Sequence, residues 1–332
     1  MKDNTIHMVK AAFHAQFKTA MENCGLSADD YFKKVKLPSK IIDPESLLPL
    51  KPFFHLINIV SINEKIPGFG SLVAQTTPWH EVLSLGPLIE NSKNLKHLVE
   101  TFCEIASSQS SLVKFSLINE GSHYYFSYSD VPIYNGDIQM ELYRITSMIQ
   151  LIHLATGEEW RPESIRLIMP QTKAADASLL LTKSNIAFLQ KDSAISIQSN
   201  LLQLPVKVKS TGKTESDNNN YANENTDFSN SIRNIINTYS LTKNTSIEET
   251  AEIVEMSVRT LQRRLKANGL KFNDLLNEAK FDHAKEKLHG TQTPIKDIAE
   301  SLGYSDAAHF TRAFHQWSGK SPTDYRKEIF KS

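Results

Sequence analysis

The feature that most constrains the fold of this 332-residue chain is the stretch from Thr293 to Arg326. Thr293 can cap a helix that opens with Pro294, because the first helical amide has no partner within the helix and proline therefore loses nothing there. Apolar residues then recur at helical spacing as far as Leu302. Gly303 is expected to end this helix, since glycine adopts the left-handed conformation at low cost.

A second short helix is predicted directly after this turn. Ser305 is a suitable cap for it, and its inner face would carry Phe310, Ala313 and Phe314. Two short helices joined by a tight turn with a glycine are typical of a helix-turn-helix unit, in which the second helix enters DNA. A helical hairpin in an unrelated bundle is the alternative interpretation.

A related pattern lies about 48 residues earlier in the chain. Ser246 and Glu249 form a capping-box sequence, and Ser257 is a suitable cap for the next helix, which Gly269 would end. Ile247, Ala251, Ser257, Leu261 and Leu265 correspond to Ile295, Ala299, Ser305, Phe310 and Phe314 at offsets of 48 to 49 residues. An internal duplication with two helix-turn-helix units is the simplest explanation.

The segment between the two units, from Phe272 to Leu288, is predicted to form one continuous helix. Its length would be roughly 26 Å at about 1.5 Å per residue. A rod of this length can hold two recognition helices near the separation of about 34–36 Å between successive major grooves on one face of DNA. One chain could then read two adjacent grooves without dimerising.

The two recognition helices supply the candidate DNA-binding residues. We expect Arg259, Gln262 and Arg263 to read bases, because arginine pairs with guanine and glutamine with adenine in the major groove. A basic face that contacts only phosphates remains the alternative, and His309 could donate to DNA or simply pack. The predicted set is Ser257, Arg259, Thr260, Gln262, Arg263 and Lys266 on the first helix, and Ser305, Asp306, Ala307, His309 and Arg312 on the second.

The first 205 residues mix helices with strands. Helical spacing is present over residues 8–25 and 27–35, after Pro52, after Asn91 and from residue 136 to 156. Alternation predicts a β-hairpin over residues 113–129 with its turn at 119–122. Three further short strands are expected at residues 164–170, 186–190 and 194–198. The predicted fold class is therefore an α+β domain with a mainly antiparallel sheet, followed by an all-α domain with two helix-turn-helix units.

Composition separates these two parts. Residues 206–228 are rich in Asn, Ser, Thr and charge, and predict a flexible linker between domains at 1–205 and 229–332. Net charge is zero overall, but residues 229–332 hold 16 Lys/Arg against 13 Asp/Glu, and the remainder holds 21 against 24. This bias toward positive charge is modest, so that charge alone does not identify a DNA-binding protein.

The cysteine content and the hydropathy of the sequence indicate in which cellular compartment the chain is expected. Cys24 and Cys103 are its only cysteines, and neither belongs to a Cys/His cluster, so that no metal site and no disulfide framework is predicted. The start of the chain lacks the continuous apolar core of a signal peptide, and no apolar run approaches the roughly 20 residues that span a bilayer. We expect a soluble cytoplasmic protein without membrane contact.

The C-terminal sequence resembles the signature of AraC/XylS-type transcriptional regulators. The resemblance rests on Ile298–Ala299, Gly303–Asp306, His309–Phe314 and Gly319–Arg326. It implies two helix-turn-helix units in one domain, with the arginine that commonly grips DNA at Arg312. Lys280 stands where the family commonly has arginine, a change that keeps the charge and weakens bidentate hydrogen bonding. The first unit diverges more from the family pattern than the second.

The N-terminal layout resembles the arabinose-binding-type sensor domain of one AraC/XylS branch, on the basis of Leu85–Leu88, the helix and hairpin that follow, and Asn200–Pro205. This implies a domain that binds a small-molecule effector or dimerises. An aromatic cluster on and after the predicted hairpin could line a pocket, although core packing is the commoner role of such residues. The cluster consists of Tyr124, Tyr125, Phe126, Tyr128 and Tyr134.

No nucleophile elbow, phosphate loop or metalloprotease helix is present in the sequence, and no catalytic residue or cofactor is predicted. The expected function is a sequence-specific transcriptional regulator under effector control, with double-stranded DNA, RNA polymerase and a possible second copy of the chain as partners. A regulator whose N-terminal domain only dimerises or binds a protein is the first alternative. An enzyme fused to a DNA-binding module is the second.

Overall fold

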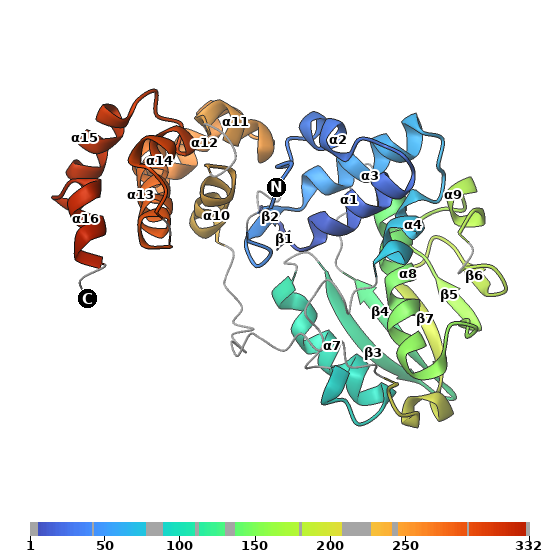
Figure 1. Ribbon diagram of the computed structural model, residues 1–332. Coiled ribbons are helices and arrows are strands. Elements are labelled where there is room, and N and C mark those ends of the chain that lie inside the picture. Colours follow the sequence, from blue (N-terminus) through green and yellow to red (C-terminus); the bar gives the residue numbers. More distant parts are fainter. Residues whose placement is uncertain are drawn as a thin grey trace. The chain divides into compact units, whose positions relative to one another are not determined.

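The computed structural model describes residues 6–41, 43–77, 89–109, 113–129, 137–178, 181–207, 227–240, 245–290 and 292–329. The chain divides into two compact units, shown as a ribbon in Figure 1. We call His7–Leu37 with Leu50–Asn225 the N-terminal unit, and Thr226–Ser332 with Met1–Ile6 and Pro38–Pro49 the C-terminal unit. Leu85–Leu88, Tyr134 and most of the predicted linker lie outside the described residues.

The N-terminal unit combines helices with one five-stranded sheet, which confirms the predicted α+β class. Its helices are α1 (Phe13–Asn23), α2 (Ala28–Lys34), α3 (Lys51–Asn63), α4 (Phe69–Thr76), α7 (Leu95–Gln109), α8 (Asp137–Thr156) and the short α9 (Lys173–Asp176), with a 3-10 turn η1 at Ser199–Gln203. The sequence did not predict α4, α9 or η1. Helix α8 has the predicted extent from Asp137 onward.

The first predicted helix begins later than expected. Residues Met8–Lys10 form the strand β1, and α1 starts at Phe13. The backbone amide of Leu50 donates to the carbonyl of His7 at 2.8 Å, so this segment is extended by a partner far away in the sequence. Spacing of apolar residues within the segment cannot reveal such a partner.

The five strands have the order β3-β4-β7-β5-β6. They are β3 (Lys114–Glu120), β4 (His123–Ser129), β5 (Ser164–Arg166), β6 (Asn185–Ala187) and β7 (Ser193–Gln198). Neighbouring strands are antiparallel except for β5 and β6, which are parallel. The predicted hairpin is confirmed, with a tighter turn than expected: Gly121 has a φ of +75°, and Asn119 and Glu120 still belong to β3.

Helices α7 and α8 pack on the same face of this sheet. The rings of Phe102 on α7 and Phe126 on β4 lie 5.8 Å apart, and the guanidinium of Arg144 on α8 lies 5.5 Å from the ring centre of Tyr128 on β4. Phe126 and Tyr128 are fully buried, as expected for core residues. Tyr124 and Tyr125 are only half-buried.

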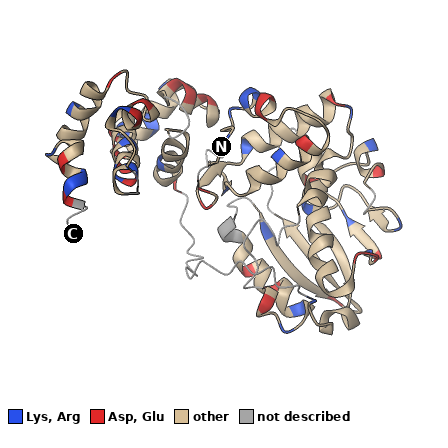
Figure 2. Ribbon diagram, in the orientation of Figure 1, with Lys and Arg blue, Asp and Glu red and all other residues tan. Residues whose placement is uncertain are grey.

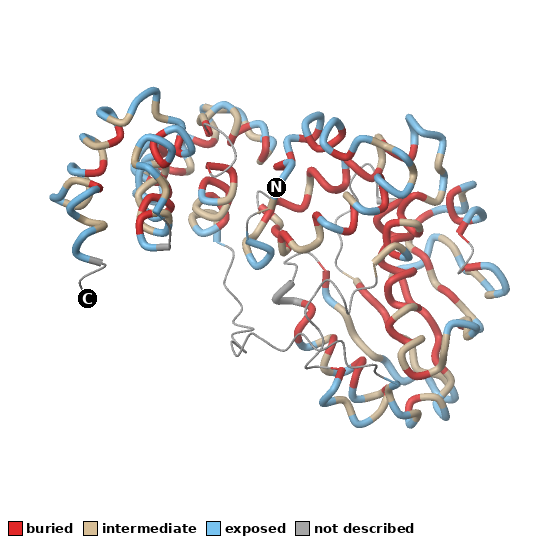
Figure 3. The backbone as a smooth tube through the Cα atoms, in the orientation of Figure 1, coloured by how far each residue is buried: buried red, intermediate tan, exposed pale blue. Residues whose placement is uncertain are grey.

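The C-terminal unit is helical, as predicted for the second domain. Its helices are α10 (Phe228–Ser240), α11 (Ile247–Ile253), α12 (Val258–Ala267), α13 (Phe272–Gly290), α14 (Ile295–Ser301), α15 (Ala307–Ser318) and α16 (Pro322–Ile329). The strand β2 (Leu47–Pro49) lies against α10 within the same unit. Figure 3 shows that buried and exposed positions alternate along these helices, which is the amphipathic pattern read from the sequence.

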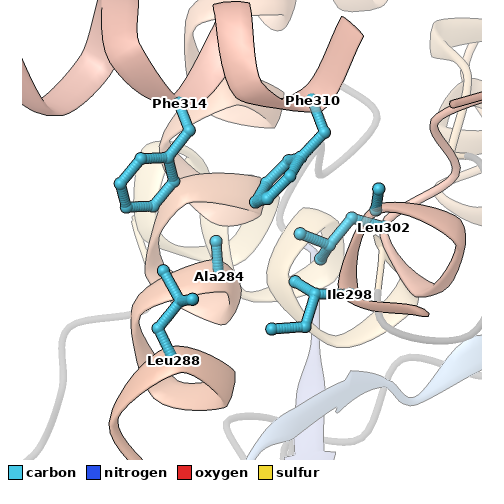
Figure 4. Packing of buried hydrophobic residues seen from close by; sticks show 7 residues of the cluster. Ala284, Leu288, Ile298, Leu302, Phe310 and Phe314 are labelled. Carbon is cyan, nitrogen blue, oxygen red and sulfur yellow. The ribbon is translucent and has the colours of Figure 1, made fainter. Parts of the chain in front are cut away.

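One hydrophobic cluster holds the second helix-turn-helix unit together (Figure 4). It consists of Ala284 and Leu288 on α13, Ile298, Ala299 and Leu302 in and after α14, and Phe310 and Phe314 on α15. The buried aromatic rings stack on partly buried neighbours: Phe314 has its ring centre 5.4 Å from that of Phe281 and 5.3 Å from that of Tyr325. Every member of the cluster comes from residues 281–325.

We therefore expect residues 227–332 to fold without the N-terminal unit. The hydrophobic cluster is complete within this fragment, and burial of its apolar side chains is the main favourable term in folding. Circular dichroism of the fragment should show a helical spectrum and a cooperative thermal transition. A disordered spectrum would contradict both the predicted boundary and the independence of the domain.

Candidate nucleic-acid interface

Helix α12 is the second helix of the first unit and its candidate recognition helix, and its N-terminus is capped as predicted. The Ser257 hydroxyl oxygen accepts a hydrogen bond from the amide of Thr260 at 3.1 Å. The two hydroxyl oxygens also lie 2.9 Å apart, so that Thr260 takes part in the cap. Leu261 and Leu265 are buried, so that the opposite side of α12 faces the solvent.

The outward side of α12 is polar and positively charged. Arg259, Gln262, Arg263 and Lys266 are all exposed, and α12 carries no acidic residue. Figure 2 shows basic and acidic residues distributed over the helices of the C-terminal unit. These are the side chains that the sequence assigned to DNA. The five N–H donors of each arginine and the amide of glutamine, which both donates and accepts, suit base edges in a major groove.

Arg264 has a different role from its neighbours. Its guanidinium carbon lies 4.0 Å from the ring centre of Phe228 on α10, and burial lowers the pKa of this arginine. Stacking on an aromatic face is favourable for a guanidinium. Arg264 therefore fastens α12 to α10, and the basic residues of α12 divide into an outward set and one that packs inward.

Helix α15 is the second helix of the second unit and its candidate recognition helix, and here the predicted cap is wrong. Its N-cap is Asp306, one residue after Ser305. One carboxylate oxygen of Asp306 accepts from the amide of His309 at 2.8 Å, and the other lies 2.6 Å from Nδ1 of the same histidine. These bonds, the backbone amide first, hold the pKa of Asp306 below its usual value.

The cap of α14 also differs from the prediction. Its N-cap is Pro294, without a side-chain hydrogen bond, and the helix begins at Ile295. Proline is present at the boundary as expected, but Thr293 does not cap the helix. Instead the carbonyl of Thr293 accepts a hydrogen bond at 2.6 Å from Arg326 on α16.

A comparison of the two turns explains the misplaced cap of α15. In the first, the amide of Met256 donates to the carbonyl of Ala251 (2.8 Å), and in the second the amide of Tyr304 donates to the carbonyl of Ala299 (3.0 Å), an offset of 48 residues. The caps Ser257 and Asp306 are 49 residues apart. The second turn is therefore one residue longer, and Asp306 rather than Ser305 corresponds to Ser257.

The two turns also differ in their left-handed residue. Gly303 has a φ of +78° in the second turn, and Glu255 occupies the same position of the first turn with a φ of +50°. A left-handed conformation costs a residue with a Cβ atom about 1 kcal/mol, whereas glycine adopts it freely. This is where the first unit departs from the sequence pattern of the second.

The outward side of α15 offers fewer donors than that of α12. His309 and Arg312 are exposed as predicted, but Ala307 is only half-buried, and the neighbouring Ala308, which the sequence interpretation omitted, is exposed. Ala308 lies one turn before Arg312, and the four-residue spacing is the signal that could have identified it. An alanine contributes only a methyl contact to a base.

The connecting helix α13 is two residues longer than predicted and ends at Gly290. Its 19 residues correspond to a rod of about 28 Å. Lys280 on this helix lies with its ammonium 4.8 Å from the ring centre of Tyr304, in the turn of the second unit, and burial lowers its pKa. Lys280 is therefore a packing residue that joins α13 to the turn.

Two helix-turn-helix units, each with a capped second helix and an outward polar face, define a DNA-binding domain with two candidate recognition helices. The N-terminal part, residues 25–206, matches the family described as the arabinose-binding domain of AraC transcription regulator, and residues 250–328 match the helix-turn-helix domain family. The chain belongs to the AraC family of transcription regulators, whose helix-turn-helix proteins bind DNA.

Relatives with known names match the C-terminal part. The Ornithine utilization regulator of Pseudomonas aeruginosa is 37% identical over 81 residues, which cover 24% of this chain and 24% of the relative. The HTH-type transcriptional regulator VqsM of the same organism is 35% identical over 84 residues, which cover 25% and 26%. The chain thus matches about a quarter of the length of these relatives.

Among solved structures, the crystal structure of transcriptional regulator CdpR from Pseudomonas aeruginosa covers 90% of this chain and 96% of its own, with 17% identity and a TM-score of 0.38. In the described part of the chain, no cluster of three or more His, Cys, Asp or Glu side chains is arranged to hold a metal ion. No helix within those same residues is long and apolar enough to cross a membrane.

Proposed function

We propose that this AraC-family chain is a sequence-specific transcriptional regulator in which α12 and α15 read DNA and the N-terminal domain binds a small-molecule effector. The observation that carries the proposal is the outward set on α12, in which Arg259, Gln262 and Arg263 are exposed on one side of a capped helix. Two arginines and a glutamine together can distinguish guanine from adenine. The domain boundaries at 205 and 229 belong to the same proposal.

The effector role rests on family membership and on a separate N-terminal unit with its own buried core. Double-stranded DNA, RNA polymerase and the effector are the proposed partners, a second copy of the chain is a further one, and the cytoplasm is the proposed location. If the N-terminal domain only dimerises, we expect the same DNA footprint, and no metabolite should change the binding of the chain to DNA. A screen of metabolites for thermal stabilisation of the full chain distinguishes the two, because a ligand that binds the native state raises its stability.

Replacement of Arg259 or Gln262 by alanine tests the base-reading role. Each variant is expected to lose about 1–3 kcal/mol of binding free energy on the cognate site and to relax the preference at one base position. Binding should be measured on cognate and random DNA at one salt concentration. Lys327→Ala on α16 is the control, since this exposed lysine lies on neither recognition helix. An equal loss on both DNAs would show that the residue contacts only phosphate.

A further inference from the structure

The N-terminal unit contains a buried arginine on α8. Arg144 is 5% exposed, and its guanidinium carbon lies 5.6 Å from the ring centre of Phe54 on α3 and 5.5 Å from that of Tyr128 on β4. Two aromatic faces stabilise a buried cation only in part, because they supply no hydrogen-bond acceptor for its N–H groups.

Arg144 has no conventional counter-ion. Within the described part of the chain it forms no ion pair within 4.0 Å, and its hydrogen-bonding neighbour is the hydroxyl of Tyr128, whose pKa it lowers. A buried charge is normally paired, since its transfer from water costs several kcal/mol that only an opposite charge with good geometry can offset. This is an unusual state for an arginine that is 95% buried.

An acidic residue beside Arg144 on α8 is engaged elsewhere. Glu141, one turn before Arg144, accepts hydrogen bonds from the amides of Ile168 at 2.8 Å and Met169 at 3.1 Å, and from the hydroxyl of Ser193. Burial nevertheless raises the pKa of Glu141. Its carboxylate fastens α8 to the segment after β5 and to β7, and it influences Arg144 only through longer-range attraction.

Two further polar atoms near this arginine lack a hydrogen bond of good geometry in the described part of the chain. The Tyr128 hydroxyl is buried and makes no hydrogen bond of ordinary geometry among the described residues. Burial raises its pKa, and the nearby Arg144 guanidinium and Ser193 hydroxyl lower it by a smaller amount. The Ser147 hydroxyl, one turn after Arg144 on α8, is also buried without a partner in the same part of the chain. Unsatisfied donors of this kind are rare in native proteins and call for an explanation.

We propose that Arg144 is the anion-binding residue of the N-terminal domain, and that the guanidinium and the Tyr128 hydroxyl receive the carboxylate of a small molecule with an apolar or aromatic body. Arginine matches a carboxylate with two parallel N–H···O bonds. One cation with Glu141 nearby suits a monoanion and not a phosphate dianion. The rings of Phe54 and Tyr128 suit an apolar body beside the charged group. The inference rests on the proposed effector role and names the chemical class of the effector.

Substitution of Arg144 tests the inference without knowledge of the effector. If the positive charge of Arg144 serves to bind a ligand, it is uncompensated in the unliganded chain. Arg144→Met removes this buried cation and should therefore raise the thermal unfolding midpoint of the unliganded full-length chain. The control is Arg166→Met. Arg166 also stacks on a tyrosine of β4, Tyr125, at 3.7 Å, but it has a carboxylate partner in Glu120. This control should leave the midpoint unchanged or lower it.

Probe carboxylates test the ligand class directly. Octanoate and benzoate should raise the unfolding midpoint of the wild-type chain, and octan-1-ol and benzyl alcohol should not. Arg144→Lys, which keeps the charge and loses the bidentate geometry, should weaken octanoate binding about 10- to 100-fold. Arg144→Met should abolish the stabilisation.

Three results would overturn the inference: an Arg144→Met chain that unfolds at a lower temperature than wild type or fails to fold, stabilisation by neither carboxylate, or equal stabilisation of wild type and Arg144→Met. Both readouts are independent of DNA. A chain that binds octanoate through Arg144 but shows no base preference would overturn the proposed DNA function alone, whereas intact sequence-specific binding with no carboxylate response would overturn only this site.

Discussion

Insertion of five base pairs between the two half-sites of the operator is expected to reduce the affinity of residues 227–332 by roughly 100-fold, to the affinity of a single unit. Helices α12 and α15 belong to units joined by α13, a rod of about 28 Å. Five base pairs rotate one half-site to the opposite face of the DNA, where the second helix cannot reach it. The loss corresponds to about two base contacts at about 1–3 kcal/mol each.

Insertion of ten base pairs is the matched control for this experiment. It returns both half-sites to one face but separates them by an additional turn, so that affinity should recover only in part because α13 cannot stretch. Footprints of the fragment on the three spacings provide the measurement. If B-form DNA cannot present both grooves to a rigid rod, the DNA must bend, and flexible base steps between the half-sites should then be favoured.

Unchanged affinity across all spacings would contradict the two-groove proposal and leave one reading helix. The sequence of the second unit resembles the family more closely, but the first unit has more exposed hydrogen-bond donors for DNA. Helix α12 has three exposed basic side chains and Gln262, whereas α15 begins with the carboxylate of Asp306 and two alanines. A single reading helix would therefore be α12.

The second large effect concerns the core of the second unit. Phe314→Ala is expected to reduce the free energy of unfolding of residues 227–332 by about 3–5 kcal/mol, because it removes a fully buried ring and leaves a cavity. Phe314 packs against Phe281, Phe310 and Tyr325, with ring centres 5.3–5.7 Å away. Since small domains have a free energy of unfolding of only about 5–15 kcal/mol, a loss of this size removes a large fraction of it.

Urea-induced unfolding of the fragment, followed by circular dichroism, measures this change. Gln316→Ala, on the exposed side of the same helix, should change the free energy of unfolding by less than about 0.5 kcal/mol. A comparable loss in both variants would show that helix propensity, and not the hydrophobic cluster, determines the stability of the unit.

The helix positions of the C-terminal unit were predictable because their signals are local. Ser257 caps α12 through a bond to an amide three residues away, and Gly303 has the left-handed conformation that its position requires. The apolar spacing of Phe310 and Phe314 likewise identified the buried face of α15. Strand β1 was missed because its partner amide belongs to Leu50, about 43 residues later in the chain.

The sequence by itself determined the two helix-turn-helix units, the outward faces of their second helices and the α+β class of the N-terminal part, since caps, turns and apolar spacing act within a few residues. The tertiary structure determined which of two adjacent residues with similar side chains has a given role. Asp306 rather than Ser305 caps α15, because the turn before this helix is one residue longer than the turn before α12. Arg264 packs on Phe228 while Arg263 is exposed, and Arg144 is buried between two rings. Each of these outcomes depends on side chains from another element, and contacts of that kind are formed only when the chain folds.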